Sequence, residues 1–127
     1  MTQTIASLMQ RQVWSVDIDD TVAQVGSLLT ERKLSWAPVL ENGSIVIGVI
    51  SAADLLQFHE QGRDANTVRA WQLCSYKPIV VDEATAAGEV ARTMVERHIH
   101  HVVVTRAEGV AGVVSSLDFV RTFIGTP

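Results

Sequence analysis

Two motifs of the same form, Ser51-x-x-Asp54 and Ser115-x-x-Asp118, could bind a polar ligand, and each directly follows a Gly-apolar-apolar run. A carboxylate at a helix start can accept two hydrogen bonds from the neighbouring hydroxyls of a ribose, and the backbone N–H groups there favour a nearby anion. The same pattern is also a common capping box, in which Ser is the N-cap and Asp stabilises the first turn. The two roles can coexist, so each motif predicts a helix start and a candidate sugar site.

A run of histidines at Arg97–His101 precedes the apolar sequence Val-Val-Val. As a metal site this run is a weak candidate, because no carboxylate or cysteine stands at a suitable spacing. Where a helix passes into a strand, however, His100 and His101 would reach into a cleft and donate hydrogen bonds to a phosphate. The equivalent positions of the first half, Ser35 and Trp36, carry no charge.

A third candidate feature is the segment of Pro78, Ile79 and Val80, which enters a short predicted strand. One interpretation is an ordinary edge strand, where a proline is tolerated. The other is a cleft edge whose backbone groups and apolar side chains suit a flat heterocycle such as adenine.

An internal repeat positions these residues. Residues 5–39 align with residues 70–104 at an offset of 65, and after one residue is lost in the turn at Asn42-Gly43, Gly48–Asp54 aligns with Gly112–Asp118. A repeat of this kind determines the whole fold. We therefore expect one module, with repeat one over about residues 5–59, a linker over about 60–68 and repeat two over about 69–123.

The hydrophobic pattern predicts the order strand, helix, strand, strand, helix in each repeat. In the first repeat, Thr21 and Gln24 have capping-box spacing, and Asn42-Gly43 is a strong hairpin signal. The predicted elements there are a helix over 22–33, strands over 36–40 and 45–50, and a helix from Ser51. In the second repeat they are strands over 79–81, 101–105 and 110–114, and helices over 85–97 and 115–123.

The predicted fold class is α/β (α+β), with two β-α-β-β-α repeats packed sheet to sheet around a pseudo-twofold axis. A repeat this small cannot cover its own sheet face, so clefts should form where the repeats meet. The three tryptophans, Trp14, Trp36 and Trp71, are expected to anchor the core or an interface rather than to stack on a ligand.

Composition excludes several classes of function. Ten Lys and Arg residues against 14 Asp and Glu residues give a net charge of −4, and the basic residues are scattered, so neither nucleic acid nor a membrane surface is an expected partner. The single cysteine, Cys74, fits a reducing compartment, and with no signal peptide or long apolar run we expect a soluble, cytoplasmic protein. No nucleophile elbow, phosphate-cradling loop or paired-acid pattern indicates an enzyme.

The repeat, the element order and the two motifs resemble a tandem pair of cystathionine-β-synthase-type (CBS) domains, the Bateman module. The likeness extends from about Ile5 to Phe123 and is strongest at Gly48–Asp54 and Gly112–Asp118. It implies a regulatory, non-catalytic module that binds AMP, ADP, ATP or S-adenosylmethionine in clefts between the repeats. It also implies a partner protein that the sequence does not identify.

The resemblance further implies how the clefts are built. Ser51 and Asp54 would hold a ribose opposite two segments, Pro78–Val80 and Ile99–His101, of which the second resembles a phosphate-binding His-Arg pair with His101 at the usual Arg position. The adenine would contact Pro78, Ile79, Val80 and Ile99, and the phosphate His100 and His101. The opposite cleft would join Ser115 and Asp118 to segments 13–15 and 34–36, which lack basic residues. We therefore expect one dominant ligand site per chain.

Relatives of this kind pair through their helices, and a homodimer is expected here. The sequence is compatible with that, because the exposed helix faces are expected to carry more apolar residues than a two-layer monomer needs. The residues on which this interpretation depends are Val25, Leu29, Val90 and Met94. Two alternatives stay open: a ligand-free dimerisation or interaction domain whose motifs only cap helices, and a metal-binding protein that uses the histidines.

Overall fold

The computed structural model describes residues 3–76 and 79–124 of the chain. The chain forms two compact units. We call Trp14–Pro78 the first-repeat unit, and Met1–Val13 together with Ile79–Pro127 the second-repeat unit. No described helix is both long and apolar enough to cross a membrane.

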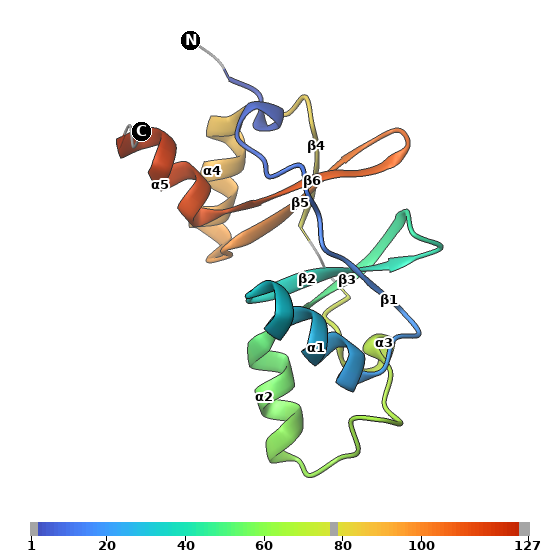
Figure 1. Ribbon diagram of the computed structural model, residues 1–127. Helices are drawn as coiled ribbons and strands as arrows, with labels where there is room; N and C mark the ends of the chain where they lie inside the picture. The colour runs from blue at the N-terminus through green and yellow to red at the C-terminus, as the bar shows by residue number, and fades with distance from the viewer. Residues whose placement is uncertain (1–2, 77–78, 125–127) are drawn as a thin grey trace. The chain divides into compact units, whose positions relative to one another are not determined.

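The first-repeat unit is a three-stranded sheet with two helices on one face (Figure 1). Strand β2 (Trp36–Glu41) lies between β1 (Val16–Asp17), to which it is parallel, and β3 (Ile45–Ser51), to which it is antiparallel. Helices α1 (Val22–Arg32) and α2 (Ala52–Glu60) follow β1 and β3, and a short helix, α3 (Ala70–Leu73), ends the unit. The core is formed by apolar side chains of α1, β2 and β3 together with α3.

Local signals in the sequence account for the ends of these elements. The Thr21 Oγ1 accepts a hydrogen bond from the Gln24 N–H at 3.1 Å, and the Thr21 N–H donates to the Gln24 side chain at 2.7 Å, which confirms the predicted capping box. In the hairpin turn, Asn42 has φ 54° and Gly43 has φ 73°. Two consecutive positive φ values match the right-handed twist of a hairpin, as Asn-Gly predicts.

The second-repeat unit repeats this arrangement. Its strands are β4 (Val80–Asp82), β5 (His101–Arg106) and β6 (Gly109–Ser115), with β4 parallel and β6 antiparallel to the central β5. Its helices are α4 (Ala87–Arg97) and α5 (Ser116–Ile124), preceded in the chain by the 3-10 turn η1 (Ile5–Ser7). The predicted element order is confirmed in both repeats, and the fold is α+β; the sheet-to-sheet packing stays a prediction.

Each unit also contains the chain segment that precedes the other repeat. The residues before the first repeat belong to the second-repeat unit, and the residues before the second repeat belong to the first-repeat unit. Gln10 forms two backbone hydrogen bonds with Val113 of β6, at 2.8 and 3.0 Å. Ser75 forms the same pair of bonds with Val49 of β3, at 2.9 and 3.0 Å. We call residues 3–13 and 65–76 the leading segments.

The close approach of the leading segments explains the glycine before each Ser-x-x-Asp motif. A Cβ atom at Gly48 would lie 2.2 Å from the Ser75 carbonyl oxygen, and one at Gly112 would lie 2.7 Å from the Gln10 carbonyl oxygen. Both distances are shorter than van der Waals contact, so any larger residue would push the leading segment off the strand.

One expectation about apolar residues needs correction. Val25, Leu29, Val90 and Met94 were predicted on exposed helix faces, but each is at most 5% exposed. They form the apolar stripe that faces the sheet, because a two-layer unit buries that stripe first. Among the tryptophans, Trp71 is 47% exposed and lies outside the core, so its expected role at an interface stays a prediction, whereas Trp14 is half-buried under the Arg32 guanidinium, 3.9 Å from its ring centre.

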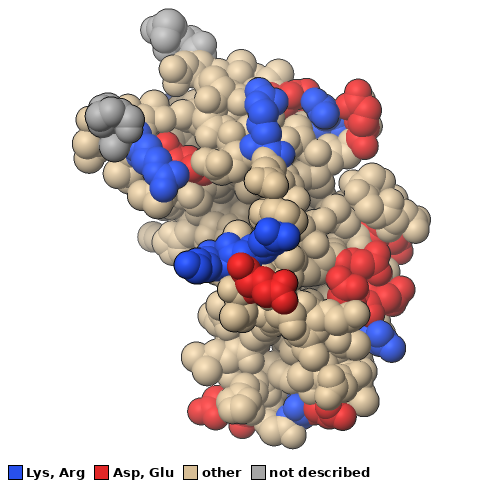
Figure 2. Space-filling view, in the orientation of Figure 1, with Lys and Arg blue, Asp and Glu red and all other residues tan. Residues whose placement is uncertain are grey.

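Charged residues are mixed on the surface. On the face shown in Figure 2, Lys and Arg occur in small separate groups, most of them beside Asp or Glu, and further Asp and Glu residues gather in one patch at the right. This distribution matches the scattered basic residues of the sequence.

Candidate functional site

Ser51 and Asp54 form a complete capping box at the start of α2. The Ser51 N–H donates to the Asp54 Oδ2 at 2.8 Å, and the Asp54 N–H donates to the Ser51 Oγ at 3.2 Å. The capping role read from the motif is therefore confirmed. Asp54 is partly buried, and its Oδ1 accepts no hydrogen bond from the described residues. One oxygen is thus fixed by the backbone, while the other has no hydrogen-bond partner among the described residues.

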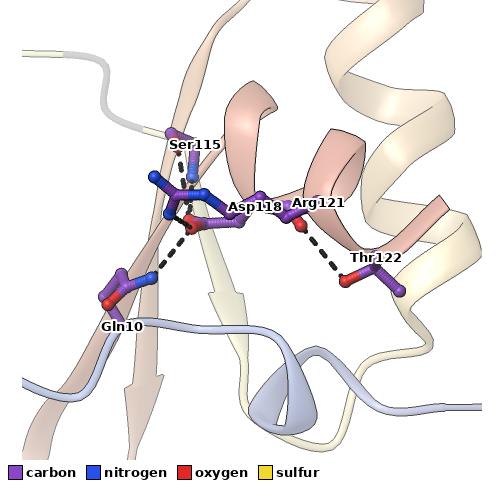
Figure 3. Close-up of polar contacts among 5 residues, drawn as sticks. All are labelled: Gln10, Ser115, Asp118, Arg121 and Thr122. Atoms are coloured by element: carbon purple, nitrogen blue, oxygen red, sulfur yellow. Dashed lines mark hydrogen bonds and ion pairs between the residues drawn. The ribbon is translucent and has the colours of Figure 1, made fainter. Parts of the chain in front are cut away.

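Asp118 has the same place at the start of α5 but different partners. Its Oδ2 accepts from the Ser115 N–H at 2.8 Å and from the Ser115 Oγ at 3.3 Å. Its Oδ1 accepts from the Gln10 Nε2 at 2.9 Å and lies 3.7 Å from a guanidinium nitrogen of Arg121 (Figure 3). Protein groups therefore occupy both oxygens of Asp118. Because the residue is only 6% exposed, these oxygens are also shielded from water.

His101 is the first residue of β5 and pairs in register with Ser115 of β6. Residues directly opposite in an antiparallel pair share a face of the sheet, so His101 and Ser115 lie on the same side. Burial lowers the pKa of His101 below its ordinary value of 6.5, and the nearby His100 lowers this pKa further. His101 is therefore neutral at pH 7, while His100 has an exposed side chain and a carbonyl that accepts from the Ser116 N–H at 3.1 Å.

The candidate adenine-contacting residues differ in exposure. Ile79 and Ile99 are partly buried and pack against the core of the second-repeat unit. Val80 is 42% exposed, so its side chain is open to a ligand. Pro78 lies outside the described residues.

Within one unit the structure brings together Ser115, Asp118 and His101, and it places Ile79, Val80, Ile99 and His100 in that same unit. Ser51 and Asp54 belong to the first-repeat unit. The grouping of Asp54 with segments 78–80 and 99–101 therefore stays a prediction.

The sequence model of the CBS domain family matches residues 5–60 and again residues 70–125. The chain belongs to the CBS domain family. Its identification as a tandem CBS pair is confirmed by these two matches. Among curated proteins, MJ0188 of Methanocaldococcus jannaschii is 29% identical over 126 residues, which is 98% of this chain and 45% of that protein. This CBS pair thus spans less than half the length of that relative.

Solved structures show the same fold. The CBS domain of a bacterial CNNM/CorC family Mg²⁺ transporter, in complex with ATP, superposes with a TM-score of 0.87 at 21% identity, over 97% of this chain and 88% of that one. The CBS domain pair of protein MJ0100, in complex with 5′-methylthioadenosine and S-adenosyl-L-methionine, gives a TM-score of 0.86 at 18% identity and covers 100% of both chains.

Three residues near the motifs of this CBS pair were not predicted as part of a site from the sequence. Arg121 had a usable signal, because it stands three residues after Asp118 on one helix face. Gln10 had none, because its contact with Asp118 depends on the exchanged leading segment. Cys74 is buried against Gly48, and burial raises the pKa of its thiol above the ordinary 9.0, whereas a hydrogen bond with Tyr76 lowers it and the charge of Asp54 raises it.

Metal ligands are not gathered in the described part of this CBS pair. Across residues 3–76 and 79–124, no group of three or more His, Cys, Asp or Glu side chains is arranged to hold a metal ion. The histidines at 98, 100 and 101 are therefore not part of such a group in the described residues.

Proposed function

We propose that this CBS pair is a non-catalytic regulatory module that binds an adenosine-containing ligand, AMP, ADP, ATP or S-adenosylmethionine, and signals to a partner protein. The observation that carries the proposal is the state of Asp54: its Oδ2 is held by the Ser51 N–H, and its Oδ1 accepts nothing from the described residues. A partly buried carboxylate in this state can accept hydrogen bonds from both hydroxyls of a ribose. The ligands of the ATP-bound and S-adenosylmethionine-bound structures support this class of ligand.

The proposal assigns the other parts of the ligand as the family resemblance implies. Adenine would contact Pro78, Ile79, Val80 and Ile99, and a phosphate would contact His100 and His101. The exposed side chain of Val80 supports the first assignment. The lowered pKa of His101 makes it a neutral hydrogen-bond donor at pH 7, so the affinity for phosphate-bearing ligands should rise as the pH falls.

The test is calorimetric titration with AMP, ATP and S-adenosylmethionine. Asp54→Asn keeps an oxygen that can accept from the Ser51 N–H but removes the charge, so the cap survives while the affinity falls at least about tenfold. His100→Ala should weaken the binding of AMP and ATP and leave that of uncharged adenosine unchanged. Glu60→Gln is the matched control, because it makes the same charge change at an exposed end of α2. Wild-type affinity in Asp54→Asn would overturn the assignment.

A second candidate function is dimerisation without a ligand, which the exposed apolar side chains of α4 and α5 favour. Val95 is 74% exposed, Val120 46% and Phe123 73%. They border an apolar groove of about 190 Å³ whose floor includes Met94 and Phe119. We propose that this CBS pair forms a homodimer and that this groove contributes to the interface, because two such faces would bury each other's apolar area. Ligand binding and dimerisation are compatible, and the titration distinguishes the module that senses a ligand from the one that only dimerises.

A further inference from the structure

Asp118 is surrounded by donors that Asp54 lacks. The Gln10 side chain and the Arg121 guanidinium both approach the Asp118 Oδ1, the oxygen that corresponds to the open one of the first motif (Figure 3). A sugar hydroxyl that donates to this oxygen would have to replace at least one of them. The second Ser-x-x-Asp motif therefore already holds an intramolecular substitute for a ligand.

The leading segment delivers Gln10 to this place. Two backbone hydrogen bonds join Gln10 to Val113, and the buried Ile5 and Met9 fix the same segment in the core of the second-repeat unit. Gln10 itself is exposed, and the Arg121 side chain is 58% exposed. The backbone at this site is thus fixed, whereas both donor side chains are free to rotate away without disturbing the core.

The first repeat offers a matched comparison at both positions. Ser75 corresponds to Gln10 and has the same pair of backbone bonds, to Val49, but its side chain does not reach Asp54. Gln57 corresponds to Arg121 and makes no hydrogen bond to Asp54. Because the backbone pairing is the same in both repeats, the side chains at these two positions explain why Asp118 has extra partners and Asp54 does not.

We propose that Gln10 and Arg121 act as an intramolecular plug on Asp118, which closes the second motif to ribose hydroxyls and makes the CBS pair bind one adenosine-type ligand per chain. This inference rests on the proposed function of the first motif. The plug is a specificity device, because a ligand gains at Asp118 only the difference between its own hydrogen bonds and the interactions it displaces, which are the Gln10 hydrogen bond and the Arg121 ion pair. Removal of both donors should raise the affinity of the second motif at least about tenfold.

The experiment measures the second motif in isolation. In an Asp54→Asn background, the double substitution of Gln10→Ala and Arg121→Gln should raise the affinity for ATP or S-adenosylmethionine above the weakened affinity of the background. In an otherwise wild-type chain the same double substitution should change the calorimetric stoichiometry from one ligand per chain to two. The matched control is Gln57→Ala with Ser75→Ala, which should leave the stoichiometry at one.

A reciprocal variant keeps the test decisive if the double substitution disturbs folding. Ser75→Gln with Gln57→Arg places the same donors beside Asp54 and should weaken the first site at least about tenfold. Two sites of similar affinity in the wild-type chain, or one site in both the wild type and a folded plug variant, would overturn the inference while leaving the proposed function intact. If the wild type binds none of these ligands, the proposed function is refuted. In that case the plug is supported only if the plug variant binds a ligand, and it is overturned if that variant binds none.

Discussion

The two Ser-x-x-Asp motifs of this CBS pair share a backbone but differ in their neighbours. In both, the Ser N–H donates to the Asp carboxylate at 2.8 Å, and in both a leading segment pairs with the strand before the motif. Around Asp54 the equivalent side chains are Ser75 and Gln57, whereas around Asp118 they are Gln10 and Arg121. The two repeats therefore share a backbone arrangement that packing maintains. Single side chains determine whether the carboxylate has a free oxygen.

The helix faces of the two units differ in the same way. Val95, Val120 and Phe123 of the second-repeat unit are exposed and apolar. The equivalent residues of the first-repeat unit are Thr30, Leu56 and His59, of which only Leu56 is apolar. The first-repeat unit has the open carboxylate and the second has the larger apolar face. We infer that the open ribose-binding carboxylate and the face for self-association are divided between the repeats.

The largest expected effect concerns what the two motifs share, the glycine under each leading segment. Gly48→Ala should destabilise the fold by about 3 kcal/mol or more, because its Cβ would meet the Ser75 carbonyl oxygen at 2.2 Å. Gly112→Ala should cost less, since the contact with the Gln10 carbonyl oxygen is 2.7 Å and the other close atoms belong to the flexible Met9 side chain. Urea unfolding monitored by circular dichroism gives both values.

The control for these variants is Gly88→Ala in α4, where a Cβ would meet nothing within 4 Å. An alanine inside a helix should leave the free energy of unfolding unchanged or raise it by up to about 1 kcal/mol. Equal stability of Gly48→Ala and the wild type would show that the leading segment does not need this close approach.

The next largest effect separates the two aspartates. Asp118→Ala should lower the free energy of unfolding by about 2–3 kcal/mol, because it leaves the Ser115 N–H without its acceptor and removes the Gln10 and Arg121 contacts. Asp54→Ala removes only a capping contact and should cost about 1 kcal/mol. Unfolding curves of the two variants in the same buffer measure the difference, and a larger loss for Asp54→Ala would reverse the comparison.

A third prediction converts one helix face into the other. Replacing the exposed apolar residues of the second-repeat unit with their first-repeat equivalents, as Val95→Thr and Phe123→His, should weaken self-association at least about tenfold. Sedimentation velocity over a range of protein concentrations measures this. Ile45→Thr, which removes an exposed apolar residue of β3, is the control and should leave association unchanged. Unaltered association in the double variant would exclude this face from the interface.

Features with local causes were predictable from the sequence. The capping boxes at Thr21 and Ser51 and the Asn42-Gly43 turn depend on residues close together in the chain, and the structure has them where they were expected. At the second motif only half of the expected capping box forms, because the Ser115 hydroxyl donates to Asp118. The apolar helix residues were misplaced for a physical reason. Periodicity shows that a face exists but not what covers it, and the face of Val25 and Leu29 is covered by the unit's own sheet.

Long-range contacts were beyond sequence reasoning. The exchange of leading segments places Gln10 on Asp118 across a separation of 108 residues, and no periodic signal encodes such a pairing. The short helix α3 and the turn η1 were missed because they contain too few residues to show a pattern. Whether the carboxylate of Asp118 is free depends on the long-range Gln10 contact, so only the local contacts of each site, the cap and the Arg121 pair, were open to prediction.

The smallest expected effect compares His101 with Trp36, its equivalent in the first repeat. Burial lowers the pKa of His101 in the folded protein below the value of 6.5 expected in the unfolded chain, so the unfolded state binds more protons. The stability that depends on neutral His101 is therefore present above about pH 6.5 and is lost as the pH falls below it. Trp36 does not titrate, so the first-repeat unit has no such dependence at the equivalent position.

The variant His101→Gln should flatten the fall in melting temperature between pH 7 and pH 5, whereas His100→Gln, at an exposed site, should change it less. If the melting temperature of His101→Gln falls with pH as steeply as that of the wild type, another group controls the loss of stability at low pH.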